Sequence, residues 1–220
     1  MEYKVYNVNK IAFIEVTNLQ GLKVIFTSAG AGIKDIYLND QKITDNALDE
    51  KSYLNSENIY GKTLSLNLND EDVELDGISY HLESKMALNR LLFSTKPMFD
   101  DNSFLVQYLF SKKYVKGGLP GNVKHYVTYA INDQSNKLIV EYRVLSDKKT
   151  LLKMHHIYKF NDNDANIVNE KELHTKQHII TINGNQKFVK QDEGILSVGD
   201  DDTAKGLTLI KRISYEFKQK

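Results

Sequence analysis

Residues 115–132 read "VKGGLPGNVKHYVTYAIN", a glycine-flanked turn that leads directly into an alternating run of apolar and polar residues. Pro120 stands just before the run, where a missing N–H does little harm to a sheet ladder. The alternation has the period of two that is typical of a half-buried β-strand. The stretch therefore predicts a shaped turn that opens a strand, and it raises the question of what this turn serves.

The same period of two runs through most of the chain. It predicts strands at 22–27 and 33–38 and in "NSFLVQYLFSKKY", "NKLIVEYRVLS", "LLKMHHIYKFN" and "QHIITING". "NDQSN", between two of these strands, is rich in turn formers. The best helical candidate, "ALDEKSYLNSENIY", has only a weak helical period. Many strands at spacings of roughly 8–12 residues predict one all-β domain over residues 1–220, a large antiparallel sandwich or barrel.

Composition limits the partners that we expect. Lys+Arg and Asp+Glu both number 29, so the chain lacks the basic surplus that favours nucleic acid. It has no cysteine, and neither the histidines nor "DDDT" shows the ordered spacing of a metal site, so we expect no metal and no other cofactor. "MEYKVYNVNKIAF" lacks signal-peptide features, and no apolar run approaches the roughly 18 residues of a membrane span. We therefore expect a soluble cytoplasmic protein without a membrane or nucleic-acid partner.

Several segments, in order, resemble the galactose mutarotase (aldose 1-epimerase) family. That family has a Gly-Phe/Tyr-Pro-Gly turn, a strand ending in Val-Thr-Tyr, and a hairpin into an "L-x-I-x-Y" strand. The matching segments here are "GLPG" (118–121), "VTY" (127–129) and "LIVEY" (138–142). "VTNLQGLKVIFTSAGAGIKDIYL" and "YHLESKMALNRLL" upstream and "KFVKQDEGILSVGD" downstream extend the similarity over nearly the whole chain. The resemblance implies a galactose mutarotase-like supersandwich.

The resemblance also implies a hexose ligand, such as galactose or glucose, and acid–base interconversion of its α and β anomers. A base takes the proton of the anomeric hydroxyl while an acid protonates the ring oxygen. "LKMHHIYKFN" matches the strand of the family's acid, which makes His156 the candidate general acid. His155, Tyr158 and Asn89 are the candidate substrate-binding residues. His156 alternates with Tyr158 and Phe160, a pattern that also suits a structural, hydrogen-bonded histidine, and both roles stay open.

Other parts of the family's catalytic set are absent. Leu92 stands where the family has a sugar-binding histidine, and "SLNLNDEDVE" has no arginine where the family has "G-R-x-x-N-R". The chain ends at "ISYEFKQK", so we expect a C-terminally truncated, active-site-degenerate member that lacks the region of the base. An unrelated acid such as Asp192 or Glu193, or a partner chain, would have to take that role.

Three hypotheses follow from these observations. The protein is an active mutarotase, a non-catalytic sugar-binding relative, or a truncated remnant that assembles as a homo-oligomer or with another chain through exposed strand edges. Carbohydrate binding on a mutarotase fold ranks first, and whether the protein is an enzyme stays open. The glycine-flanked turn would then shape the mouth of a sugar-binding cleft, although an ordinary β-turn explains its glycines equally well.

Overall fold

The computed structural model describes residues 1–45, 49–50, 53, 59–66, 69–100, 102–160, 166–169, 171–185, 187–190, 196–199 and 203–220. Within these ranges the regular structure consists of strands and two 3₁₀ turns, η1 (Ser84–Met86) and η2 (Leu88–Arg90). The prediction of an all-β chain is confirmed. The helical candidate at 47–60 lies mostly outside the described residues.

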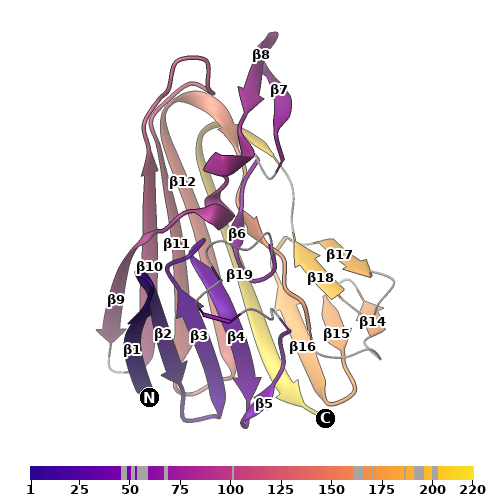
Figure 1. Cartoon of the computed structure of the whole chain (residues 1–220). Coiled ribbons are helices and arrows are strands. Elements are labelled where there is room, and N and C mark those ends of the chain that lie inside the picture. Colours follow the sequence, from indigo (N-terminus) through magenta and orange to yellow (C-terminus); the bar gives the residue numbers. More distant parts are fainter. Residues whose placement is uncertain are drawn as a thin grey trace.

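Two antiparallel sheets form the body of the molecule (Figure 1). The small sheet has the order β1 (Glu2–Val8), β2 (Ile11–Thr17), β3 (Leu22–Thr27), β4 (Gly32–Leu38) and β5 (Gln41–Lys42). The large sheet has the order β14 (Asn166–Asn169), β15 (Glu172–His174), β16 (His178–Asn183), β19 (Ala204–Gln219), β12 (Lys137–Leu152), β11 (Val123–Asn132), β10 (Ser103–Lys112) and β9 (Ser94–Asp100). The predicted antiparallel β-sandwich is therefore confirmed.

The C-terminal strand lies inside the large sheet. Strand β19 pairs with β12 along one side and with β16 along the other. Strand β19 therefore has a neighbouring strand on each side.

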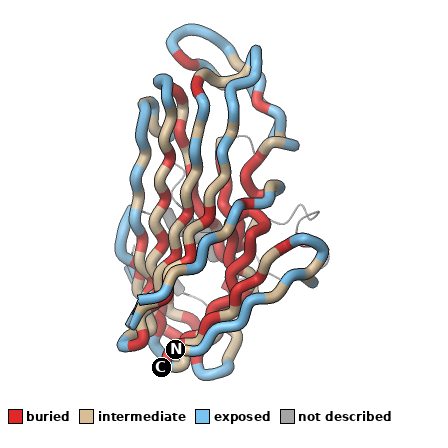
Figure 2. The backbone as a smooth tube through the Cα atoms, turned by 90° about the vertical axis from the view of Figure 1, so that its left-hand side faces the viewer, coloured by how far each residue is buried: buried red, intermediate tan, exposed pale blue. Residues whose placement is uncertain are grey.

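The sheets pack face to face because alternate residues of each strand are apolar and point inward. Phe104, Val106 and Tyr108 of β10 are fully buried, as are Val24 and Phe26 of β3, and all five belong to one hydrophobic cluster. Burying each such side chain contributes roughly 1.5–3 kcal/mol. Buried positions concentrate where the small sheet covers the large one (Figure 2).

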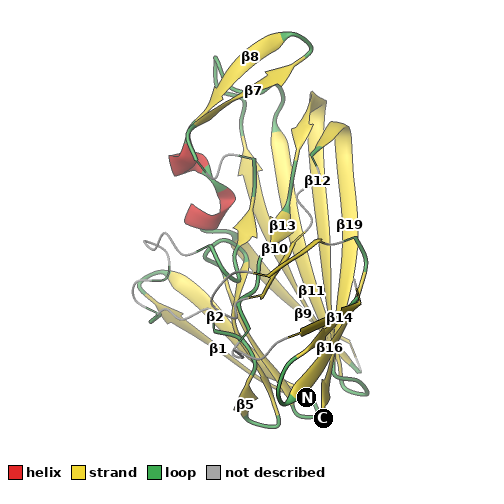
Figure 3. Cartoon of the chain, turned by 90° about the vertical axis from the view of Figure 1, so that its right-hand side faces the viewer, coloured by secondary structure: helices red, strands yellow, loops and turns green. Residues whose placement is uncertain are grey.

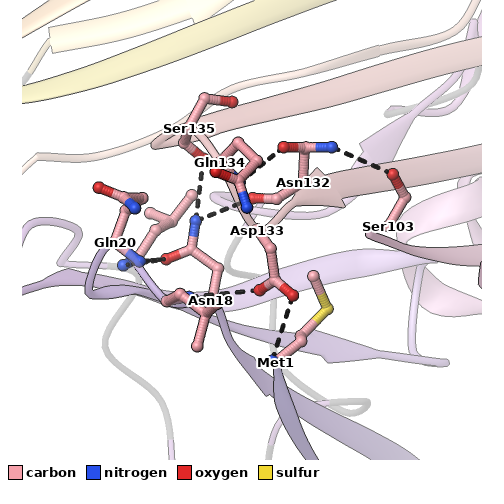
Figure 4. A network of polar contacts seen from close by, with 10 residues as sticks. Met1, Asn18, Gln20, Ser103, Asn132, Asp133, Gln134 and Ser135 are labelled. Carbon is pink, nitrogen blue, oxygen red and sulfur yellow. Dashed lines mark hydrogen bonds and ion pairs between the residues drawn. The ribbon is translucent and has the colours of Figure 1, made fainter. Parts of the chain in front are cut away.

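The turn between β11 and β12 joins the lower ends of the two sheets (Figure 4). Asn18 Nδ2 donates hydrogen bonds to the carbonyls of Asn132, at 3.0 Å, and Ser135, at 2.9 Å. Asp133 accepts a bond of 3.3 Å from the backbone N–H of Leu19, and its other oxygen lies 3.2 Å from the Met1 amino group. The predicted turn "NDQSN" therefore also holds the small sheet in place.

At their other end, the upper end in Figure 1, the strands of the large sheet extend beyond the small sheet. There η1, η2 and the hairpin of β7 (Glu71–Leu75) and β8 (Ile78–Leu82) lie on one side of the sheet (Figure 3). The short strands β6 (Thr63–Leu64) and β13 (His155–His156) pair with each other, and β17 (Lys187–Lys190) pairs with β18 (Leu196–Gly199). The cover of the upper end is therefore built from short elements instead of a second sheet.

Candidate functional site

A pocket opens between the upper end of the large sheet and this cover. Its volume is about 60 Å³, well below the roughly 300–1,000 Å³ of a pocket that holds a whole small-molecule ligand. It is therefore large enough for one group of a ligand and too small to enclose an entire hexose. The lining residues come from β6 to η2, the ends of β10 to β12 and the loops beside them: Ser65, Leu66, Leu82, Met86, Leu88, Lys112, Leu119, Gly121, Val123, His125, Thr150, Leu151, Leu152 and Lys153.

The glycine-flanked turn at 115–122 forms one wall of this pocket through Leu119 and Gly121. Gly121 has φ of +98°, and a Cβ at this position would collide with the Ser146 hydroxyl. The next residue, Asn122, donates from its backbone N–H at 2.7 Å and from Nδ2 at 2.6 Å to the carboxylate of Asp147. Glycine therefore lets the loop approach β12 closely, which fixes the wall of the pocket.

Two polar lining residues, Lys112 and His125, lie at the ends of strands that are apolar farther down. On β10, Lys112 continues the inward-facing column of Phe104, Val106 and Tyr108 at the same period of two. On β11, His125 occupies the corresponding position one step before Val127. Beyond the small sheet these columns are no longer sealed by a facing sheet, and their side chains face the pocket.

Two buried polar atoms of the pocket lack hydrogen bonds. Neither Nδ1 of His125 nor Oγ1 of Thr150 has a partner among the described residues. Burial, together with the nearby charge of Lys112, lowers the pKa of His125 to about 4, although a backbone hydrogen bond to Phe110 acts in the opposite direction. His125 is therefore neutral at pH 7. Unpaired buried groups of this kind are costly and often mark where water or a ligand binds.

His156, the candidate acid, lies between the two sheets and is 2% exposed. Its Nδ1 is 2.6 Å from the Tyr142 hydroxyl, and its Nε2 is 2.8 Å from the Tyr129 hydroxyl and 3.2 Å from Thr63 Oγ1. The Tyr129 hydroxyl itself donates to the carbonyl of Ala31 at 2.6 Å. Protein groups therefore occupy both ring nitrogens.

These contacts indicate one tautomer of His156. Because Tyr129 gives its single proton to Ala31, its oxygen accepts from Nε2–H of His156, and Nδ1 accepts from Tyr142. The pKa of His156 is lowered to about 3, chiefly by burial; hydrogen bonding at Ala31 opposes this shift, and the nearby His155 contributes to it. A neutral ring without a free nitrogen has the properties of a structural histidine in this conformation.

The three candidate substrate-binding residues are also buried. Tyr158, 1% exposed, stacks on the His156 ring at a centroid distance of 5.6 Å and an interplanar angle of 4°. His155 is 5% exposed and pairs with Leu64 across β13 and β6. Asn89 is 3% exposed, lies in η2, and its Oδ1 has no hydrogen-bond partner within the described ranges. The structure brings His155, His156 and Tyr158 together between the sheets. Neither these three residues nor Asn89 lines the pocket.

No aspartate or glutamate appears among the described residues that line the pocket. Asp192 and Glu193, the candidate substitutes for the base, lie outside the described residues. The described ranges also contain no group of three metal-ligating side chains. Within those ranges no helix is long and apolar enough to cross a membrane.

Sequence reasoning missed Lys112, His125, Thr150 and Lys153. A signal for the first was present in "FLVQYLFSK", where the inward period of two continues from apolar residues to a lysine. A charge at the end of an apolar column predicts that the column leaves the core there. Thr150 and Lys153 had no comparable signal, because the register between β12 and β19 shifts between Leu145 and Thr150.

The fold is that of a galactose mutarotase-like β-sandwich. No protein-family model matches the sequence, and no curated protein matches it. Solved structures do match. The galactose 1-epimerase from Lactobacillus acidophilus NCFM aligns with a TM-score of 0.79 and 11% identity, over 99% of this chain and 98% of that one.

Two further solved structures also align with this chain over nearly its whole length. The GalM/aldose epimerase homologue from C. elegans aligns with a TM-score of 0.73 and 15% identity, over 95% of this chain and 99% of that one. A galactose mutarotase-like protein from Clostridium acetobutylicum aligns with a TM-score of 0.72 and 10% identity, over 100% and 99%. The predicted mutarotase-like fold is confirmed. Each alignment covers nearly all of both chains.

Proposed function

We propose that this protein binds a carbohydrate at the pocket at the upper end of the large sheet and does not interconvert the anomers of that carbohydrate. One observation carries the proposal. The pocket lies on a mutarotase-like fold, where the turn that resembles the family's Gly-Phe/Tyr-Pro-Gly motif forms its wall through Leu119 and Gly121. The lining combines apolar side chains with a few convergent polar groups, as carbohydrate sites and other small-molecule sites do.

The lack of turnover follows from the chemistry that the site offers. Anomer exchange needs an acid and a base within hydrogen-bond reach of one sugar. The described lining contains no carboxylate, and both nitrogens of His156 are occupied by protein groups. Ser65 and Leu66, the first residues of the segment that lacks the family's arginine, also line the pocket. We place this function in the cytoplasm, which the cysteine-free composition supports.

Binding and turnover are tested together on one sample. Ligand-observed NMR with glucose and galactose detects binding, and polarimetry of freshly dissolved α-anomers at neutral pH detects mutarotation. We expect weak binding and a mutarotation rate equal to that of buffer. Leu119→Trp should abolish binding by filling the pocket, whereas Leu207→Trp, the same change at an exposed residue that does not line it, should leave binding intact.

Two results would contradict this proposal. A rate above that of buffer, lost in His156→Ala, would show that a working acid–base pair exists and that His156 contacts substrate. Equal sugar binding by the two tryptophan variants would place the sugar elsewhere on the protein.

The alternative function, assembly through exposed strand edges, has less support. The outer strand β9 of the large sheet contains Lys96 and Pro97, and such residues oppose edge-to-edge pairing. At the edge of the small sheet, Tyr3 of β1 is exposed and packs on Phe99 with ring centroids 4.4 Å apart. Sedimentation at rising concentration tests assembly, and a dimer that forms without sugar would favour this alternative.

A further inference from the structure

The pocket contains positive charge without a counter-charge. Lys112 and Lys153 both line it, and both are half-buried. Neither forms an ion pair with any residue that the structure describes. A partly buried ammonium group loses hydration, which disfavours its charged form unless an anion lies close by. Burial accordingly lowers the pKa of Lys112, and Glu83, at a distance, opposes this shift.

Two neutral polar groups in the same pocket also lack hydrogen-bond partners among the described residues. Oγ1 of Thr150 can donate or accept a hydrogen bond, and Nδ1 of His125 can do either, depending on its tautomer. Neither atom has a partner in the described part of the chain. Two cations and two unpaired polar atoms therefore converge on a cavity of about 60 Å³.

The strand ends that form the sheet side of the pocket are rich in lysine. The segments 111–124 and 145–153 lie side by side in the sheet, where Lys124 pairs with Leu145. Together they contain a single acidic residue, Asp147, whose carboxylate accepts two hydrogen bonds from Asn122. They contain seven lysines: Lys112, Lys113, Lys116, Lys124, Lys148, Lys149 and Lys153. Clustered charge of one sign raises the local concentration of ligands of the opposite sign.

We infer that the ligand of this pocket is an anionic sugar, which carries a phosphate or carboxylate group that Lys112 and Lys153 bind. This inference rests on the proposed carbohydrate function and specifies its ligand class. Lysine binds phosphate as a mobile point charge, and hydrogen bonds between ionised partners are roughly twice as strong as neutral ones. Thr150 Oγ1 would donate to one of the remaining oxygens of the anion, and the sugar ring, whose hydroxyl groups can donate to Nδ1 of His125, would lie in the open mouth beside Leu119.

Calorimetric titration of the full chain with four probes tests the inference: glucose, glucose 6-phosphate, glucuronate and inorganic phosphate. We expect one of the two anionic sugars to bind at least about tenfold tighter than glucose and than inorganic phosphate. The preferred sugar shows whether the pocket selects phosphate or carboxylate. Its affinity should also fall as the salt concentration rises.

Matched variants separate the pocket from the general charge of this end of the sheet. Lys112→Gln combined with Lys153→Gln should remove the preference for the anionic sugar. Lys113→Gln removes the same charge from the exposed neighbour of Lys112, which does not line the pocket, and should preserve the preference. All three lysines are half-buried or exposed, so both variants should fold. Thermal unfolding of each variant checks this.

The other possible results distinguish failure of the anionic-sugar inference from failure of the proposed carbohydrate function. Equal affinities for glucose and both anionic sugars would overturn the inference and leave carbohydrate binding in place. A preference that persists in the double variant would also overturn the inference. Inorganic phosphate that binds as tightly as glucose 6-phosphate would leave an anion site but refute the carbohydrate function. No binding of any probe would refute both.

Discussion

The two ends of the large sheet use the same strands for different purposes. In the lower part, the inward columns of β10, β11 and β12 face a second sheet and seal His156 among Tyr129, Tyr142 and Thr63. In the upper part, the same columns continue into Lys112 and His125, which face a pocket covered only by short elements. The residue most strongly suggested by family resemblance thus lies in the sealed part, whereas the groups accessible to a ligand lie in the open part.

This comparison shows that a matching position does not guarantee a matching role. A histidine can act as a general acid only when a nitrogen reaches the substrate. The His156 ring instead lies within hydrogen-bond distance of three buried hydroxyl groups, those of Tyr129, Tyr142 and Thr63. If the comparison is correct, changes in the sealed part should alter stability, and changes in the open part should alter binding.

The largest effect is expected from His156→Ala. Removal of the ring leaves a cavity and deletes the hydrogen bonds that it makes with the hydroxyls of Tyr129 and Tyr142, and should lower the free energy of unfolding by about 4 kcal/mol. Lys112→Gln, in the open part, should change it by less than about 0.5 kcal/mol. Urea denaturation at pH 7 measures both. A His156→Ala protein of unchanged stability that no longer binds sugar would reverse the assignment.

Acidification should lower the free energy of unfolding through His156 by somewhat less than the His156→Ala substitution does. Since the folded-state pKa of His156 is about 3 and its ordinary value is 6.5, the unfolded chain binds more protons between these values. Stability contributed by the neutral ring is therefore complete above pH 6.5 and is lost as the pH falls towards 3. Between pH 7 and pH 4 the expected loss from this group is about 3 kcal/mol. The lowered pKa of His125, about 4, adds a loss of the same sign.

Urea denaturation at both pH values, in wild type and His156→Gln, isolates the contribution of His156 from that of the carboxylates. The variant should lose less stability on acidification. NMR of the ring nitrogens should show the neutral Nε2–H tautomer down to about pH 4. A ring that titrates near 6.5 would mean that His156 is open to solvent and available to a ligand.

The smallest effect comes from a matched pair of tyrosines in the sealed part. The Tyr142 hydroxyl bonds to His156 Nδ1, so Tyr142→Phe should cost about 1–2 kcal/mol of unfolding free energy. The Tyr158 hydroxyl is buried without a hydrogen-bond partner among the described residues, so Tyr158→Phe should be neutral or slightly stabilising. Thermal unfolding compares the two. Equal costs would contradict the hydrogen-bond network around His156.

Much of the fold could be predicted from the sequence, because the spacing of apolar residues is a local property. The alternation at 22–27 predicted β3, and the turn formers of "NDQSN" predicted the turn between β11 and β12. The same alternation placed His156 and Tyr158 on one face. It could not show which part of that face a second sheet would cover, since that depends on packing between residues distant in the chain.

The sequence by itself determined several of the long strands and the turn at "NDQSN", because a period of two requires no knowledge of distant partners. It also led to the mutarotase-like fold through an ordered series of short motifs. It did not show that the strand predicted over "LLKMHHIYKFN" is interrupted after Leu152 and reduced to the two residues of β13. Only the tertiary structure decided that His156 is sealed and that Lys112, His125 and Lys153 share a pocket. The overall charge of zero concealed the lysine-rich strand ends beside the pocket, because these lysines come from two segments that only strand pairing brings together.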